Sequence, residues 1–117
     1  TTTFFTAAHN ESDSDAGPLE YDAGYDLAQG TTFQRLTRNT GNQNDECCSG
    51  YLHLFNPSST TFVKHFTAVT QSLQQNEYSN HCHIAGYFNT TSAIDAIQFA
   101  NASGNIDAGD ICLYGIL

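Results

Sequence analysis

Apolar and polar side chains alternate along several stretches of the chain, as they do in strands with one buried face. In Gly50–Phe55 the two leucines lie on one side, and Tyr51, His53 and Phe55 lie on the other. In Thr61–Thr70 the phenylalanines, Lys64 and Ala68 likewise lie opposite the other members of the run. We therefore predict strands over four stretches: Thr1–Ala8, Gly50–Phe55, Thr61–Thr70 and His81–Asn89, the last interrupted at Gly86 as by a bulge.

A further pair of strand-like runs lies near the C-terminus. Ala93–Phe99 and Asp110–Tyr114 are joined by Ala100–Gly109, which is rich in Asn, Ser and Gly. Turn residues between two apolar runs are typical of a β-hairpin. We predict that the two runs pair with each other.

The stretches between these runs are rich in polar and turn-forming residues. His9–Asp26 is acidic and contains Pro18, so we expect a loop, and Asn39–Glu46 and Gln71–Asn80 are also expected to be loops or turns. The periodicity of Leu27–Thr37 fits a strand or a single helical turn. Five or six short strands with turns about every ten residues predict an all-β, jelly-roll-like antiparallel β-sandwich.

The composition narrows the classes of partner. Three basic residues face twelve acidic ones, which gives a formal charge of −9. Such a chain repels phosphate backbones and lacks the cationic face that attracts anionic lipid, so we expect neither nucleic-acid nor membrane binding. Charged residues make up only 13% of the chain. That low charge density suits a surface that packs against copies of itself.

Length and cysteine use bear on the kind of domain. The 117 residues suffice for one domain, residues 1–117, and the chain has no Met and begins in a strand-like run. We expect that N-terminal strands of a longer protein precede it. Of the four cysteines, Cys47 and Cys48 are adjacent and difficult to pair simultaneously, so free thiols are expected.

Two motifs invite a metal interpretation. On a strand, His81 and His83 share a face and could chelate Zn²⁺, but Cys47, Cys48 and His53 do not lie at spacings that complete a zinc site. The acidic loop that begins at Glu11 departs from the spacing of calcium loops: its glycine comes one place late and the closing Glu is missing. We expect no metal and no cofactor.

No catalytic set of residues stands out. Alternation directs Cys82 away from its flanking histidines, so a nucleophilic triad is not favoured. Asp95 is interpreted as a buried carboxylate that accepts structural hydrogen bonds. We therefore expect no catalytic residue and no enzymatic activity.

Three long strings carry a resemblance to a known family: SGYLHLFNPSSTTFVKHF (Ser49–Phe66), AGYFNTTSAIDAIQF (Ala85–Phe99) and SGNIDAGDICLYGI (Ser103–Ile116). They resemble small β-sandwich virion structural proteins of marine tailed, cyanophage-like bacteriophages, which end in a GNIDAG-x-I-x-LYGI pattern. The resemblance implies a non-enzymatic virion component that is assembled in the cytoplasm of a bacterial host. Cys47-Cys48 and the His81-Cys82-His83 triplet depart from the family pattern, which argues against a shared metal or thiol function.

Two roles follow from this resemblance. One is exposed capsid decoration or another outer component, which acts through self-assembly as a trimer or other symmetric oligomer and docks on major capsid or tail proteins. The other is a tail-fibre module that binds glycans on the host surface. Tyr51, His53, Phe55 and Tyr87 are the candidate binding or interface residues in either role.

Overall fold

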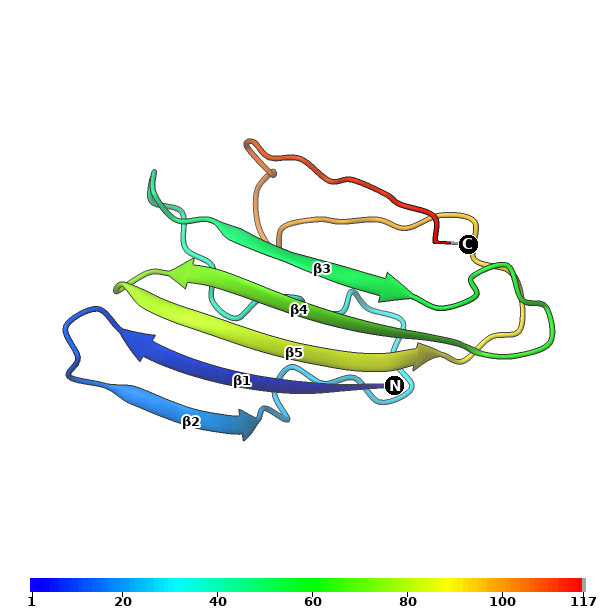
Figure 1. Cartoon of the computed structure of the whole chain (residues 1–117), viewed down its shortest axis with the longest axis horizontal. Coiled ribbons are helices and arrows are strands. Elements are labelled where there is room, and N and C mark those ends of the chain that lie inside the picture. The colour runs from blue at the N-terminus through cyan, green and yellow to red at the C-terminus, as the bar shows by residue number, and fades with distance from the viewer. Residues whose placement is uncertain (117) are drawn as a thin grey trace.

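The structure, a computed structural model, describes residues 1–116 and contains five strands in one antiparallel sheet (Figure 1). The strands follow the spatial order β2-β1-β5-β4-β3, which places the last strand of the chain at the centre. Their bounds are β1 Thr2–Asn10, β2 Ala16–Tyr21, β3 Cys48–Leu54, β4 Lys64–Gln74 and β5 Tyr78–Phe88. The predicted all-β class is confirmed. The jelly-roll sandwich is not confirmed, because all strands found in residues 1–116 belong to this single sheet.

The longest pairing joins β4 to β5. The two strands pair from Lys64↔Phe88 to Gln74↔Tyr78, so the predicted loop Gln71–Asn80 shrinks to a three-residue turn. Asn76 and Glu77 take positive φ angles of 69° and 60° there, and the Glu77 N–H donates to the Gln74 carbonyl at 3.1 Å. The sequence predicts a loop here because the paired ends of β4 and β5 carry polar Ser, Gln and Asn residues. The register passes Gly86 without a shift, so the bulge predicted there is wrong.

Strand β2 lies within the segment predicted to be an acidic loop. Its outer edge is unpaired, which is why Pro18 and exposed side chains are compatible with a strand here. The β1–β2 turn is held by Asn10, whose side-chain oxygen accepts from the backbone N–H groups of Ser14 and Asp15, both at 3.0 Å. The bulge of this sheet lies in the same pairing, between Thr6 and Ala8.

One face of the sheet carries the core. Its buried apolar residues are Phe4, Phe66, Ala68, Cys82 and Ile84. The segment 22–47 passes behind the sheet in Figure 1 and covers this inner face with Tyr25 and Leu36. The Phe4 and Tyr25 rings lie 5.3 Å apart, and the Thr70 hydroxyl donates to the Leu36 carbonyl. The long coil is therefore one layer of the fold.

Lys64 is buried on the same inner face, with 1% of its surface exposed. Its ammonium group donates to the Thr90 carbonyl at 3.2 Å and to the Ser92 carbonyl. A buried cation needs such acceptors to offset the loss of hydration. This contact ties the start of the C-terminal segment, residues 89–116, to the sheet.

The rest of the C-terminal segment contradicts the predicted hairpin. Ala93–Phe99 and Asp110–Tyr114 are extended coil without strand pairing, and the segment projects beyond β3 (Figure 1). Ile94 is half-buried, but the large apolar side chains from Ile97 onward are exposed, from 37% for Phe99 to 91% for Leu113. The β-forming residues there have no neighbouring strand, so propensity alone does not form a strand. The radius of gyration of 15.4 Å exceeds the about 13 Å expected for a compact chain of this length.

Candidate binding surface

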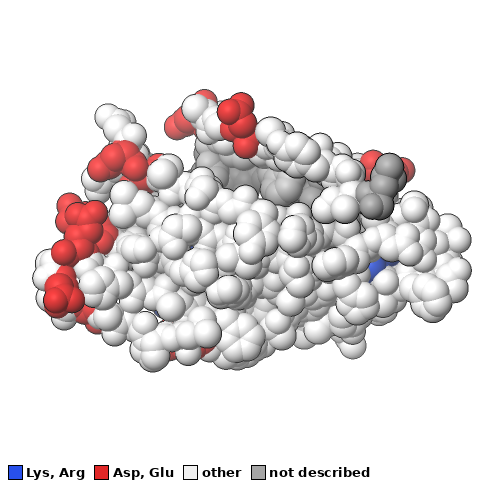
Figure 2. Space-filling model, in the orientation of Figure 1, with Lys and Arg blue, Asp and Glu red and all other residues white. Residues whose placement is uncertain are grey.

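The face of the sheet opposite the core is open, and its side chains form the candidate site. Strands β1–β5 contain only two charged residues, Glu20 and Lys64, and both lie on the inner side. Figure 2 views the open face, where the surface is almost wholly uncharged apart from one small Lys or Arg patch toward the right-hand end. Acidic residues gather around it, at the end that holds the β1–β2 and β4–β5 turns and along the C-terminal segment. A neutral platform thus lies within a strongly acidic molecule.

All five histidines of the chain lie on this open face. The cross-strand pairs identify its rows: Gln71 pairs with His81, Val69 with His83, and His65 with Tyr87. His9 differs from the others, because its ring nitrogen lies 3.0 Å from an Asp13 carboxylate oxygen. The remaining four are His53, His65, His81 and His83.

The four residues singled out from the sequence are brought together here. Tyr51 and His53 lie on β3 and Phe55 directly follows the strand, with successive ring centroids 5.1 Å and 6.4 Å apart. Tyr87 lies two strands away beside His65, with ring centroids 6.1 Å apart. Aromatic rings at these distances form a continuous apolar surface with polar edges. The sequence predicted a shared side for Tyr51, His53 and Phe55, but it could not show that Tyr87 lies on the same face with β4 between them.

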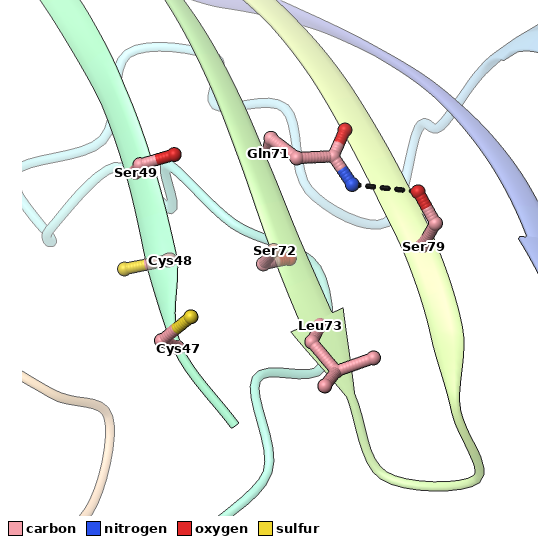
Figure 3. Close-up of a pocket in the computed structure, with 7 residues that line it drawn as sticks. All are labelled: Cys47, Cys48, Ser49, Gln71, Ser72, Leu73 and Ser79. Atoms are coloured by element: carbon pink, nitrogen blue, oxygen red, sulfur yellow. Dashed lines mark hydrogen bonds between the residues drawn. The ribbon is translucent and has the colours of Figure 1, made fainter. Parts of the chain in front are cut away.

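A shallow hollow of about 200 Å³ lies where the turn end of β4 meets β3 and β5 (Figure 3). It is lined by Cys47, Cys48, Ser49, Gln71, Ser72, Leu73 and Ser79. Figure 3 shows the Gln71 amide nitrogen directed at Ser79, where it donates to the hydroxyl at 2.7 Å, while its oxygen points away. The volume is below the about 300 Å³ at which small-molecule pockets begin. A flat surface, rather than a pocket, is therefore the main feature of this face.

The thiols do not form a reactive centre. All four cysteines are free, as predicted; Cys82 is buried and the others are exposed. Cys82 points into the core, 3.8 Å from the Thr6 hydroxyl, and so away from the histidines beside it in the sequence. Among residues 1–116 no group of three or more His, Cys, Asp or Glu side chains is arranged to hold a metal ion.

The interpretation of Asp95 as a buried, hydrogen-bonded carboxylate is wrong. Asp95 is exposed in the C-terminal coil and accepts no hydrogen bond from the described residues. The carboxylates that do interact lie at the rim of the sheet. Asp15 accepts from the Tyr78 hydroxyl at 2.7 Å, and this hydrogen bond raises the pKa of Tyr78; a bond to Asp26 raises the pKa of Tyr21 in the same way.

Sequence reasoning missed the extent of this face. His9, His65 and Gln71 belong to it, and alternation alone places His65 opposite Phe66. The order of the strands could not be obtained in this way, because it depends on β1 inserting beside β5.

Neither the fold nor the sequence leads to a known relative. In the described part of the chain there is no helix long and apolar enough to cross a membrane. No model of a known protein family matches the chain, and neither curated proteins nor solved structures show a significant similarity to it.

Proposed function

We propose that this protein is a non-enzymatic virion structural protein that acts through self-assembly, as exposed capsid decoration or another outer component of a tailed phage. The observation that supports assembly most strongly is the uncharged open face of the sheet on a chain of net charge −9. The assignment to a virion depends on the resemblance of the three strings in Ser49–Ile116 to phage structural proteins.

Charge favours a second copy as the partner of the open face. Two molecules that each carry −9 repel each other wherever their acidic rims meet. The open face avoids this cost, since its strand residues include no Asp or Glu. Strands about 4.8 Å apart and seven residues long give about 500 Å² per copy, or about 1,000 Å² in total, which is the lower limit for a specific interface.

Two sheets commonly pack face to face, and this packing buries the apolar side chains of both. The central row of the open face contains Tyr51, Val69, His83 and Phe5, whose side chains are large enough to interdigitate with a partner sheet. Major capsid or tail proteins are the further partners in this proposal. A symmetric oligomer, such as a trimer, presents the same face from every subunit.

A glycan-binding tail-fibre module is the second candidate. The row of Tyr51, His53 and Phe55 favours it, because sugars stack on exposed rings. The open face offers hydroxyl, amide and imidazole groups for sugar hydroxyls. Carboxylates reach it only at the β1–β2 edge, where Asp13 meets His9 and Asp26 meets Tyr21, and this edge lies opposite β3. That set of donors is poorer than carbohydrate sites need, so we rank this role second.

The test places one charge at the centre of the open face. Val69→Glu is compared with Ser103→Glu, an equal change of charge at an exposed position in the C-terminal segment. Sedimentation velocity at tens of micromolar should show an oligomer for the wild type and Ser103→Glu, and a monomer for Val69→Glu. A monomeric wild type would overturn the proposal.

Copy number on the particle separates the two roles. Hundreds of copies indicate capsid decoration, whereas a few tens indicate a tail fibre. Binding of the purified protein to a panel of surface glycans, lost in Tyr51→Ala, would favour the second role.

A further inference from the structure

The central strand carries two imidazoles that lean toward each other on the open face. Side chains two positions apart on a strand start about 6.5–7 Å apart. The ring centroids of His81 and His83 are only 4.6 Å apart, with an angle of 81° between the ring planes. The rings have therefore converged, although no hydrogen bond joins them or ties either ring to another described residue.

We propose that His81 and His83 form a chelating site for a divalent transition-metal ion of the copper–nickel type. Neutral imidazole is a preferred ligand of these ions. It binds at about 2.0–2.1 Å, which leaves the centroids of two adjacent ligands about 4.5 Å apart in a square arrangement and about 5 Å apart in a tetrahedral one. The observed separation fits the square arrangement better. This site goes beyond the proposed function and does not rest on it. His83 also lies in the central row that the proposed partner sheet would cover, so the site belongs to the molecule before assembly.

The surroundings of the pair favour a cation. The cross-strand neighbours of His81 are Ala7 and Gln71, and those of His83 are Phe5 and Val69. No Lys or Arg is among these four neighbours to repel a bound cation. Gln71, a cross-strand neighbour of His81, also has a side-chain oxygen that takes no part in the hydrogen bond to Ser79. The acidic rim attracts cations to the whole molecule.

The other histidines of the face lack this arrangement. His53 lies between Tyr51 and Phe55, and His65 lies beside Tyr87, so neither has a second imidazole as its neighbour. They are exposed like His83 and provide matched controls. Two ligands leave the remaining positions of the ion to water, to Gln71 or to a second molecule.

The experiment titrates Ni²⁺ into the full chain by calorimetry at pH 7.5. Cys47, Cys48 and Cys112 are replaced by Ser in every sample, because exposed thiols bind the same ions. We expect one ion per chain, with affinity about tenfold or more weaker in His81→Gln and in His83→Gln because chelation is lost. His53→Gln and His65→Gln should change it less than twofold.

Two results would overturn the site: unchanged affinity in His83→Gln, or an equal loss in His53→Gln. Circular dichroism checks that each variant is folded. Paramagnetic broadening by Cu²⁺ gives a second measurement on the protein with its histidines intact. The amide signals of residues 81–83 and of their neighbours Phe5 and Gln71 should broaden first, and broadening centred elsewhere would also contradict the proposal.

Discussion

The sheet and the C-terminal segment contain similar residues but differ in the structure they form. Ile84 in β5 has strands on both sides and is 2% exposed, whereas Ile111 in the segment has none and is 65% exposed. Both occur in strand-like patterns of β-branched and aromatic residues. The comparison shows that a strand is defined by its neighbours, since pairing and packing supply the energy that its own propensity does not.

The largest expected effect comes from truncating a core side chain, compared with the same kind of truncation in the C-terminal segment. Phe4 is fully buried against Tyr25, so Phe4→Ala should lower the free energy of unfolding by about 3–5 kcal/mol. Leu113 is 91% exposed, and Leu113→Ala should change it by no more than about 0.5 kcal/mol. Urea denaturation followed by circular dichroism measures both. Equal losses would mean that the segment packs against the sheet in solution.

A pair of glycine substitutions gives an intermediate effect. A Cβ atom on Gly86 would lie 2.6 Å from Thr2 Cγ2 and 2.7 Å from the Thr1 carbonyl oxygen. Gly86→Ala therefore forces β1 and β5 apart and should cost about 1–3 kcal/mol. Nothing lies within 4 Å of a Cβ on Gly115, so Gly115→Ala should be nearly neutral. Thermal melts of the two variants provide the check, and a destabilised Gly115→Ala would reveal a contact of the segment.

The smallest change in the free energy of unfolding is expected when the hydrogen bonds that link the sheet to the C-terminal segment are removed. Lys64→Met removes the hydrogen bonds to Thr90 and Ser92 but keeps an apolar stem in place. The free energy of unfolding should change by less than about 1 kcal/mol, because the desolvation cost of the ammonium group is removed as well.

Cleavage in the C-terminal segment should nevertheless become several-fold faster in this variant. Limited proteolysis with chymotrypsin, which cuts after Phe88 and Phe99, measures it. Thr67→Met is the control, since residue 67 lies on the same strand and faces outward. An unchanged cleavage rate in Lys64→Met would show that Lys64 does not hold the segment.

Alternation predicted the parts of the fold that depend on local pattern. The side assignments of Leu52, Tyr51 and Lys64 are confirmed, because period two is intrinsic to a strand. Strand β2 was missed, since a short, exposed edge strand with Pro18 has the composition of a loop. The C-terminal hairpin was predicted in error, because the pattern reports what a segment could pair with and not whether a partner is adjacent.

The candidate surface was predictable in part for the same reason. The shared side of Tyr51, His53 and Phe55, and that of His81 and His83, follow from single strands. The convergence of five histidines from four strands depends on strand order, which joins residues distant in sequence. The segment 22–47, which covers the inner face, has no periodic pattern, so the face that stays open could not be predicted.

The central position of β5 has a consequence for how the chain folds. β3, β4 and β5 are sequential neighbours, so they can form a meander through connections of nine and three residues, 55–63 and 75–77. Thr6 meets Cys82 across 76 positions, and within residues 1–116 this β1–β5 seam is the one strand pairing that joins the β1–β2 hairpin to the meander. Closing such a long loop is slow. During synthesis β1 therefore has no strand partner on this side until β5 emerges, and we expect the seam to be the last part of the sheet to form.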